Sequence, residues 1–197
     1  MAFHPRKGMQ ELINTNPMKG FYFLASISII QSFLAISREM FLGFSLGFFL
    51  ALSFIIVISP FIGALIFSIE AYLLRFVGNK WLNGTAPTSY IKACVAYSSL
   101  PSWINLIFVF VLLIGFPQYF FKGIYPSFLN NFQVFINNVA MLWGLIILIG
   151  GLAEAEKFTI GKAIGCFVLY VLMILLIVFS AVMLGIFIAG FFPQARI

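Results

Sequence analysis

Five long uncharged runs divide the chain and restrict it to folds that place most of the sequence in a lipid bilayer. They cover residues 20–37, 40–69, 93–121, 123–153 and 163–195, and they are 18, 30, 29, 31 and 33 residues long. One membrane-spanning helix needs ~20 apolar residues, whereas two spans with a turn need roughly 40. Each run therefore predicts one span. Only 8% of the residues are charged and 63% are hydrophobic, so too few polar side chains exist to cover a soluble domain.

We therefore expect an all-α fold: a polytopic integral membrane protein with five transmembrane helices. The expected spans lie at about 21–37, 50–77, 90–116, 132–153 and 160–191. Pro60 predicts a kink in the second span and Pro101 lies within the third, because proline removes a backbone donor from a helix. Thr159 is the predicted N-cap of the fifth span.

The five spans form one expected membrane domain, residues 21–197, after a cytosolic N-terminal segment, residues 1–20. Residues 40–49 are assigned to an interfacial segment. The reason is that the apolar stretch 40–74 is far longer than a ~30 Å hydrocarbon core requires at ~1.5 Å per residue. Residues 21–37 also resemble a signal peptide, but the charged segment before them is unusually long for one.

The basic residues predict the orientation of the spans. Eight of them fall on the side of the N-terminus: Arg6, Lys7, Lys19, Arg75, Lys80, Lys92, Lys157 and Lys162. Three fall on the other side: Arg38, Lys122 and Arg196. Because Lys and Arg are enriched in cytoplasmic loops, this bias predicts an N-in/C-out topology. The Asn-Gly-Thr sequon at 83–85 then lies inside. It is expected to form a turn and to carry no glycan.

Residues that support catalysis or metal binding are scarce. The chain has no Asp and a single His, His4, which precedes the first span. Hydrolytic triads and metal sites both need several such side chains to converge. Cys94 and Cys166 are too few for a disulfide framework and are interpreted as apolar fillers. We expect no enzyme, no cofactor and no metal, and the scattered basic residues do not form a nucleic-acid patch.

Glu70 is the most informative single residue, because a carboxylate inside an apolar helix is costly. One interpretation makes it a proton- or cation-responsive group, or one that holds a gate. The other makes it an interfacial Glu paired with a cation, for which Lys92 is the candidate. Arg75 is five positions away, off the spacing of three or four that places side chains on one face.

Two further groups of residues are candidates for contacts. Arg75, Glu154, Glu156, Lys157 and Lys162 lie near the predicted inner surface, where a solvated cluster and a docking patch for a cytosolic partner are both possible. Small residues favour close helix packing. The packing candidates are Pro60, Gly63, Ala181, Gly185 and Ala189. Asn105, Asn137 and Asn138 are expected to form hydrogen bonds between helices.

The order of several motifs resembles that of a known family. They are Pro-Arg at 5–6, Asn-Pro at 16–17, Pro-Phe-Ile-Gly at 60–63, Ala-Tyr-Ser-Ser-Leu-Pro at 96–101, Trp143, and Lys-Ala at 162–163. This pattern is similar to the bacterial branch of the Yip family, the Ypt/Rab-GTPase-interacting membrane proteins. The resemblance implies five membrane helices with a cytosolic N-terminus. Eukaryotic members form oligomers and bind Rab GTPases, and they carry a long cytosolic N-terminal region and an Asp-Leu-Tyr-Gly-Pro motif that this chain lacks. This chain has no Asp, so Rab GTPase binding is not carried over.

Two functions remain open at this stage. The first is a non-enzymatic protein of a bacterial inner membrane that acts through helix association, as a homo-oligomer or as an accessory subunit of a membrane assembly or export system. The alternative is a small transporter or channel in which Glu70, Tyr97 and Pro101 line a route at the kinked centres of the second and third spans. Lys92 is a further candidate functional or gating residue. Broken helices at membrane depth are typical of transport sites.

Overall fold

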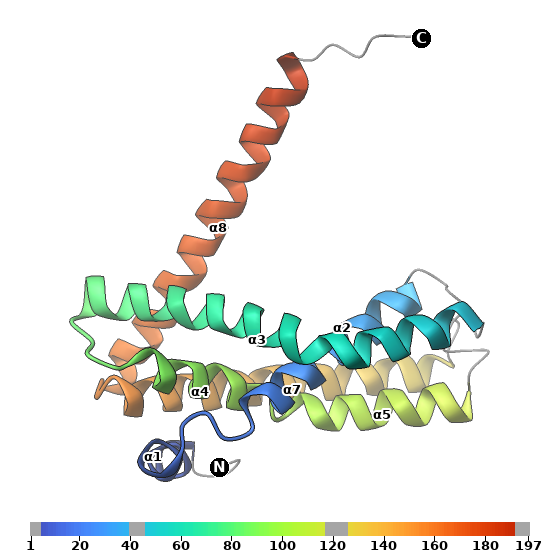
Figure 1. Ribbon diagram of the computed structural model, residues 1–197, viewed down its shortest axis with the longest axis horizontal. Helices are drawn as coiled ribbons and strands as arrows, with labels where there is room; N and C mark the ends of the chain where they lie inside the picture. The colour runs from blue at the N-terminus through green and yellow to red at the C-terminus, as the bar shows by residue number, and fades with distance from the viewer. Residues whose placement is uncertain (1–4, 40–45, 117–125, 192–197) are drawn as a thin grey trace.

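The described residues of the computed structural model, 5–39, 46–116 and 126–191, form helices joined by short connections, with no strand among them. Figure 1 labels the helices in chain order. They are α1 (Pro5–Thr15), α2 (Phe21–Glu39), α3 (Leu46–Leu82), α4 (Thr88–Ser98), α5 (Ser102–Gly115), α7 (Ser127–Ala155) and α8 (Ile160–Phe191).

Within the described ranges, four helical segments are long and apolar enough to cross a membrane: Gly47–Leu82, Thr88–Gly115, Ser127–Ala155 and Ile160–Phe187. A fifth apolar helix, Phe21–Ser37, is shorter. The expectation of an all-helical, multi-pass membrane protein is therefore confirmed.

The interfacial segment expected at 40–49 overlaps the start of α3. Residues 46–49 belong to α3, while 40–45 lie outside the described residues. The side chain of Phe48 explains the longer helix. It is buried beside Leu34 of α2 and Leu112 of α5, and its ring stacks on Phe33 at 6.2 Å between centroids. Packing inside the protein thus extends α3 beyond the length that the bilayer requires.

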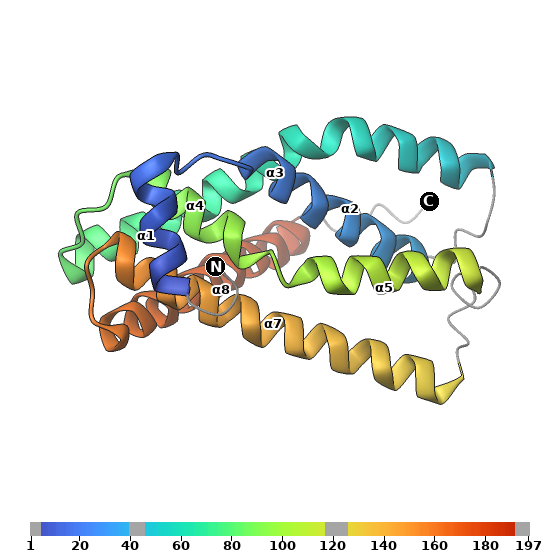
Figure 2. The same cartoon turned by 90° about the horizontal axis from the view of Figure 1, so that it is seen from below.

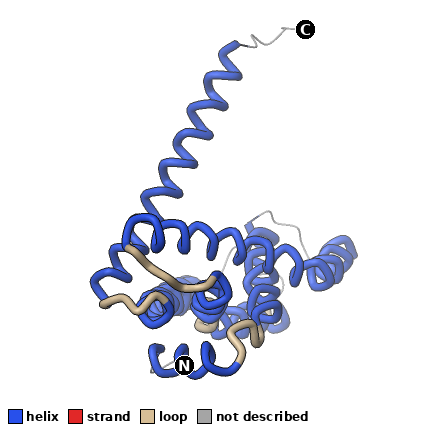
Figure 3. The backbone as a smooth tube through the Cα atoms, turned by 60° about the vertical axis from the view of Figure 1, so that its left-hand side comes forward, coloured by secondary structure: helices blue, strands red, loops and turns tan. Residues whose placement is uncertain are grey.

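The helices form one layered group from which α8 departs. In Figures 1 and 2, α3, α5 and α7 extend along a common direction, α2 lies beside α3, and α1 crosses α4 and α7 near one end. Figure 2 also shows α3 changing direction near its middle, the region of Pro60. Only the first turns of α8 pack against α3 and α7, and its remainder projects away from the other helices (Figure 3).

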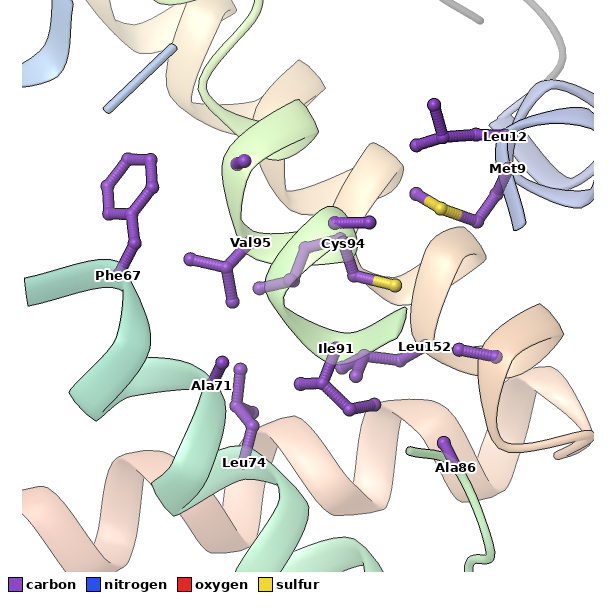
Figure 4. Packing of buried hydrophobic residues seen from close by; sticks show 14 of the residues in the cluster. Met9, Leu12, Phe67, Ala71, Leu74, Ala86, Ile91, Cys94, Val95 and Leu152 are labelled. Carbon is purple, nitrogen blue, oxygen red and sulfur yellow. The ribbon is translucent and has the colours of Figure 1, made fainter. Parts of the chain in front are cut away.

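Among the described residues, two apolar clusters hold the group together at opposite ends, and a third, formed by Val77, Phe158 and Cys166, joins the start of α8 to α3. The larger one joins α1, α2, α3, α4 and α7 and is shown in Figure 4. In it, Met9 and Leu12 of α1 lie against α4 and α7, and Ile91 of α4 lies against Leu74 of α3. The second cluster joins Phe48 to α2 and to the last turns of α5. The N-terminal helix is thus part of the same packed core as the membrane helices.

The third expected span is broken into α4 and α5 by a tight turn at residues 99–101. The hydroxyls of Ser98 and Ser99 donate to the carbonyls of Val95 (2.7 Å) and Ala96 (2.6 Å). Pro101, which has no backbone N–H, precedes α5 and is buried. The turn therefore satisfies polar groups within the chain, as backbone at membrane depth must.

Gly144 of α7 packs directly on this turn. A Cβ atom at Gly144 would lie 2.6 Å from the carbonyl oxygen of Ser98. Gly63 makes a similar approach in α3, where a Cβ atom would lie 2.5 Å from the carbonyl oxygen of Ala25. Both glycines let one helix touch the backbone of another, which explains why α7 lies close to the break and α3 close to α2.

Gly144→Ala should destabilise the protein. Alanine normally strengthens a helix relative to glycine, so a loss here would come from the contact with Ser98. We expect about 1–3 kcal/mol, the usual cost of forcing an extra methyl into a packed site. Thermal unfolding of the purified protein in detergent measures it. Gly115→Ala is the matched control, because a Cβ atom there meets nothing within 4 Å. Equal melting temperatures for the two variants would contradict the contact.

Candidate functional site

The polar groups of the structure gather at the end of the helices where α3 meets α4 and α7 meets α8. Glu156 is central to this region and is only 4% exposed. Its Oε2 accepts a hydrogen bond of 2.8 Å from the backbone N–H of Ala86, in the connection between α3 and α4. Its Oε1 is buried with no hydrogen-bond partner among the described residues. The carboxylate therefore fastens two connections that lie far apart in the sequence.

Two glycines make room for this carboxylate. A Cβ atom at Gly78 would lie 3.0 Å from Oε1 of Glu156, and a Cβ atom at Gly84 would overlap its Oε2. The backbone places Glu156 here because α7 ends in a Schellman motif: the N–H of Phe158 bonds to the carbonyl of Ala153 at 2.8 Å. Such endings need a left-handed residue, and Lys157 takes that conformation with φ 55°.

Glu156 is therefore buried, whereas the sequence analysis placed it in a group of residues near the inner surface. Next to it, Lys157 and Lys162 are exposed as expected. The sequence did not predict the hydrogen bond between Glu156 and Ala86. An acidic residue at the end of a helix has the same local sequence pattern whether it faces water or a neighbouring loop. The feature of the sequence that could have indicated this contact is the pair Gly78 and Gly84, near that loop, because both leave room for the carboxylate.

The other members of that group have individual partners. Glu154 forms an ion pair with Arg6 of α1 at 3.6 Å, with side chains 27% and 50% exposed. The Nζ of Lys162 lies 6.0 Å from the centroid of the Phe158 ring. Thr159 accepts a hydrogen bond of 3.4 Å from the N–H of Lys162, so its prediction as an N-cap is confirmed. These contacts tie α1, α7 and α8 together at one end.

Arg75 and Lys92 both lie on the contact between α3 and α4. Nη1 of Arg75 donates to Oγ1 of Thr88 at 2.6 Å. Nζ of Lys92 lies 5.5 Å from the ring centroid of Tyr72. Among the described residues Lys92 forms no ion pair with Glu70, so the pairing expected from the sequence is not formed. Glu70 itself is partly exposed on α3.

Two of the residues suggested for a transport route, Tyr97 and Pro101, contact other parts of the chain. The hydroxyl of Tyr97 donates to the carbonyl of Lys19 at 3.0 Å, and Pro101 is buried in the α4–α5 turn. Asn105 of α5 donates to Asn137 of α7 at 3.2 Å, the interhelical hydrogen bond expected at lipid depth. Asn138 is exposed on α7.

The packing candidates separate into two kinds. Gly63 lies in a close helix contact, next to Pro60 inside α3. Ala181 and Gly185 lie on the projecting part of α8 and are exposed, and a Cβ atom at Gly185 meets nothing within 4 Å. Ala189 belongs to α8, but its side chain lies outside the described set.

Nothing in this arrangement has the composition of a metal centre. No group of three or more His, Cys, Asp or Glu that could hold a metal ion occurs among the described residues. Cys94 and Cys166 are free and buried, and the Sγ of Cys166 lies 3.8 Å from the carbonyl oxygen of Leu74. Both thiols fill apolar space between helices.

The fold and its polar end define a multi-pass, all-helical integral membrane protein. The family model of the Yip1 domain matches residues 1–182. The chain therefore belongs to the Yip1 domain family, to which its motifs already showed a resemblance. Comparisons with curated proteins and with solved structures found no match.

Glu156→Ala should lower stability because it leaves the buried N–H of Ala86 without an acceptor. The expected loss is about 1–3 kcal/mol, the cost of an unsatisfied buried donor. Glu156→Gln keeps an acceptor oxygen and should lose less. Thermal unfolding in detergent compares the variants.

Glu154→Ala is the matched control, since its ion pair with Arg6 is partly exposed and such pairs contribute about 0–1 kcal/mol. If Glu156→Ala and Glu154→Ala melted together, the buried hydrogen bond would have no special role in stability.

Proposed function

We propose that this protein is a non-enzymatic component of a bacterial cytoplasmic membrane that acts by associating with other membrane helices. The partner is a second copy of the chain or another subunit of a membrane assembly. The observation that carries the proposal is the isolation of α8. Every residue from Leu175 to Phe187 is exposed, although the other long helices all have buried faces.

The composition of α8 supports association through this projecting part. Lipid covers an apolar helix as well as another apolar helix does, so helices associate in a membrane only where they can pack closely. Ala181 and Gly185 are four positions apart and so share one face of α8. Between the large side chains around them they leave a shallow strip for a neighbouring helix.

The α4–α5 break supports association more than transport. Broken helices in transporters present free backbone groups to a substrate. Here the hydroxyls of Ser98 and Ser99 bond back to carbonyls of α4, and the backbone of Ser98 is covered by Gly144. The break thus serves to pack α7 against α4 and α5.

Gly185→Leu tests the association. The new side chain has open space in the single chain, so folding should be unaffected while a helix packed on this face would be pushed away. Crosslinking in native membranes, followed by gel electrophoresis, should show at least a severalfold loss of crosslinked complexes. Gly115→Leu adds the same side chain at another open position and should leave the complexes intact. Undiminished complexes in Gly185→Leu would refute this interface.

We also propose five spans with the N-terminus inside, α2 being the shortest of them. The basic residues near the α3–α4 and α7–α8 connections support this orientation through the positive-inside rule. A cysteine introduced at Lys157 should react with an impermeant maleimide from the cytosolic side, and one at Ser127 from the opposite side. Cys94 and Cys166 are buried, so background labelling should be low. Labelling of both positions from one side would overturn the topology.

A further inference from the structure

Two cationic side chains meet where α3 packs against α4. Arg75 reaches Thr88 with a hydrogen bond of 2.6 Å, and the ammonium of Lys92 lies 5.5 Å from the ring centroid of Tyr72. Tyr72 and Arg75 are three positions apart on α3, and Thr88 and Lys92 are four apart on α4, so each pair shares a helix face. The guanidinium and the ammonium are therefore about one helical turn apart along the line of contact between the two helices. We call this line, formed by Tyr72 and Arg75 of α3 and Thr88 and Lys92 of α4, the α3–α4 seam.

No carboxylate neutralises these cations among the described residues, where the ion pair observed joins Arg6 and Glu154. Glu70 is five positions before Arg75, which places it about 140° away around α3. The ammonium of Lys92 lies near two aromatic rings, the first being that of Tyr72. The second is Phe21 of α2, whose centroid lies 5.8 Å away. Arg75 and Lys92 thus have no ion-pair partner among the described residues, although the carboxylate of Glu156 lies at the same end of the helices, bound to the N–H of Ala86.

Both cations retain hydrogen-bond donors. A guanidinium has five donors and an ammonium three. The bond to Thr88 is the one formed by Arg75 within the described part of the chain, and its Nε is buried without a partner. Neither side chain is fully buried. A group with several anionic oxygens, such as a phosphate, matches this set of donors best.

The aromatic side chains around the seam place it at the depth of lipid headgroups. The α3 helix has 37 residues, about 55 Å, so its ends extend well beyond a ~30 Å hydrocarbon core. Tyr72, Phe76 and Trp81 in its last turns are 56%, 50% and 49% exposed. Exposed Tyr and Trp gather at membrane–water interfaces. Arg75 lies between Tyr72 and Phe76 in the sequence, at the level where phosphates of the bilayer are found.

We propose that the α3–α4 seam binds the phosphate of an anionic phospholipid, held by Arg75 and Lys92, with the exposed rings of Tyr72 and Phe76 against its acyl chains. The lipid phosphate supplies the ion-pair partner that neither cation has among the described residues. This site is distinct from the association surface proposed on α8 and does not depend on it.

The test uses the full chain, purified in detergent and delipidated. Phosphatidylglycerol is added, and bound lipid is counted by native mass spectrometry, with zwitterionic phosphatidylcholine and inorganic phosphate as parallel probes. Phosphatidylglycerol should bind in preference to phosphatidylcholine. Lys92→Gln should weaken this binding about fivefold, the usual effect of one basic residue on anionic lipid. Lys92→Arg keeps the charge and should bind like the wild type, which separates a lost charge from a failure to fold.

Lys162→Gln is the matched control, because it removes a lysine at the same end of the protein that also lies over an aromatic ring. It should leave phosphatidylglycerol binding unchanged. Equal losses in Lys92→Gln and Lys162→Gln, or no loss in either, would overturn the site. Displacement of phosphatidylglycerol by an equal concentration of inorganic phosphate would assign the seam to the free ion and overturn the lipid.

Discussion

Helices surrounded by lipid gain little hydrophobic energy by touching one another, so this protein depends on places where two backbones come close. Gly63 against Ala25 and Gly144 against Ser98 are two such places. Gly151 instead makes room for side chains, because a Cβ atom there would lie 3.1 Å from the Sγ of Cys94. The fully buried positions between the helices are rich in alanine, including Ala71, Ala93, Ala96, Ala153 and Ala163. The core therefore combines small residues, which let helices approach closely, with large buried side chains such as Phe21 and Phe48.

The two ends of the helices are held together in different ways. At one end, directed polar contacts join the connections: Glu156 to Ala86, Arg75 to Thr88, and Arg6 to Glu154. At the other end, the described contacts are mainly between Phe and Leu side chains around Phe48. The larger apolar cluster also lies at the polar end, so that end is held by both kinds of contact.

The sequence predicted what local pattern determines and missed what depends on distant partners. The bounds of α8 and its cap at Thr159 follow from an apolar run that begins after a capping residue and agree with the structure. The early start of α3 depends on Phe48 meeting α2 and α5. The burial of Glu156 depends on a loop about 70 positions away. Neither partner lies within the stretch of sequence that a local pattern covers. For the same reason, the composition of α8 did not predict that it projects away from the other helices.

The position of α1 has a consequence for how the chain is assembled. Met9 lies against Gly151 and belongs to the same cluster as Cys94, so the binding site of α1 is made of helices that are synthesised long after it. During translation the apolar face of α1 has no α4 or α7 to pack against until those helices have been synthesised. We therefore expect docking of α1 to be among the last steps of folding, because it requires α4 and α7 to be in place.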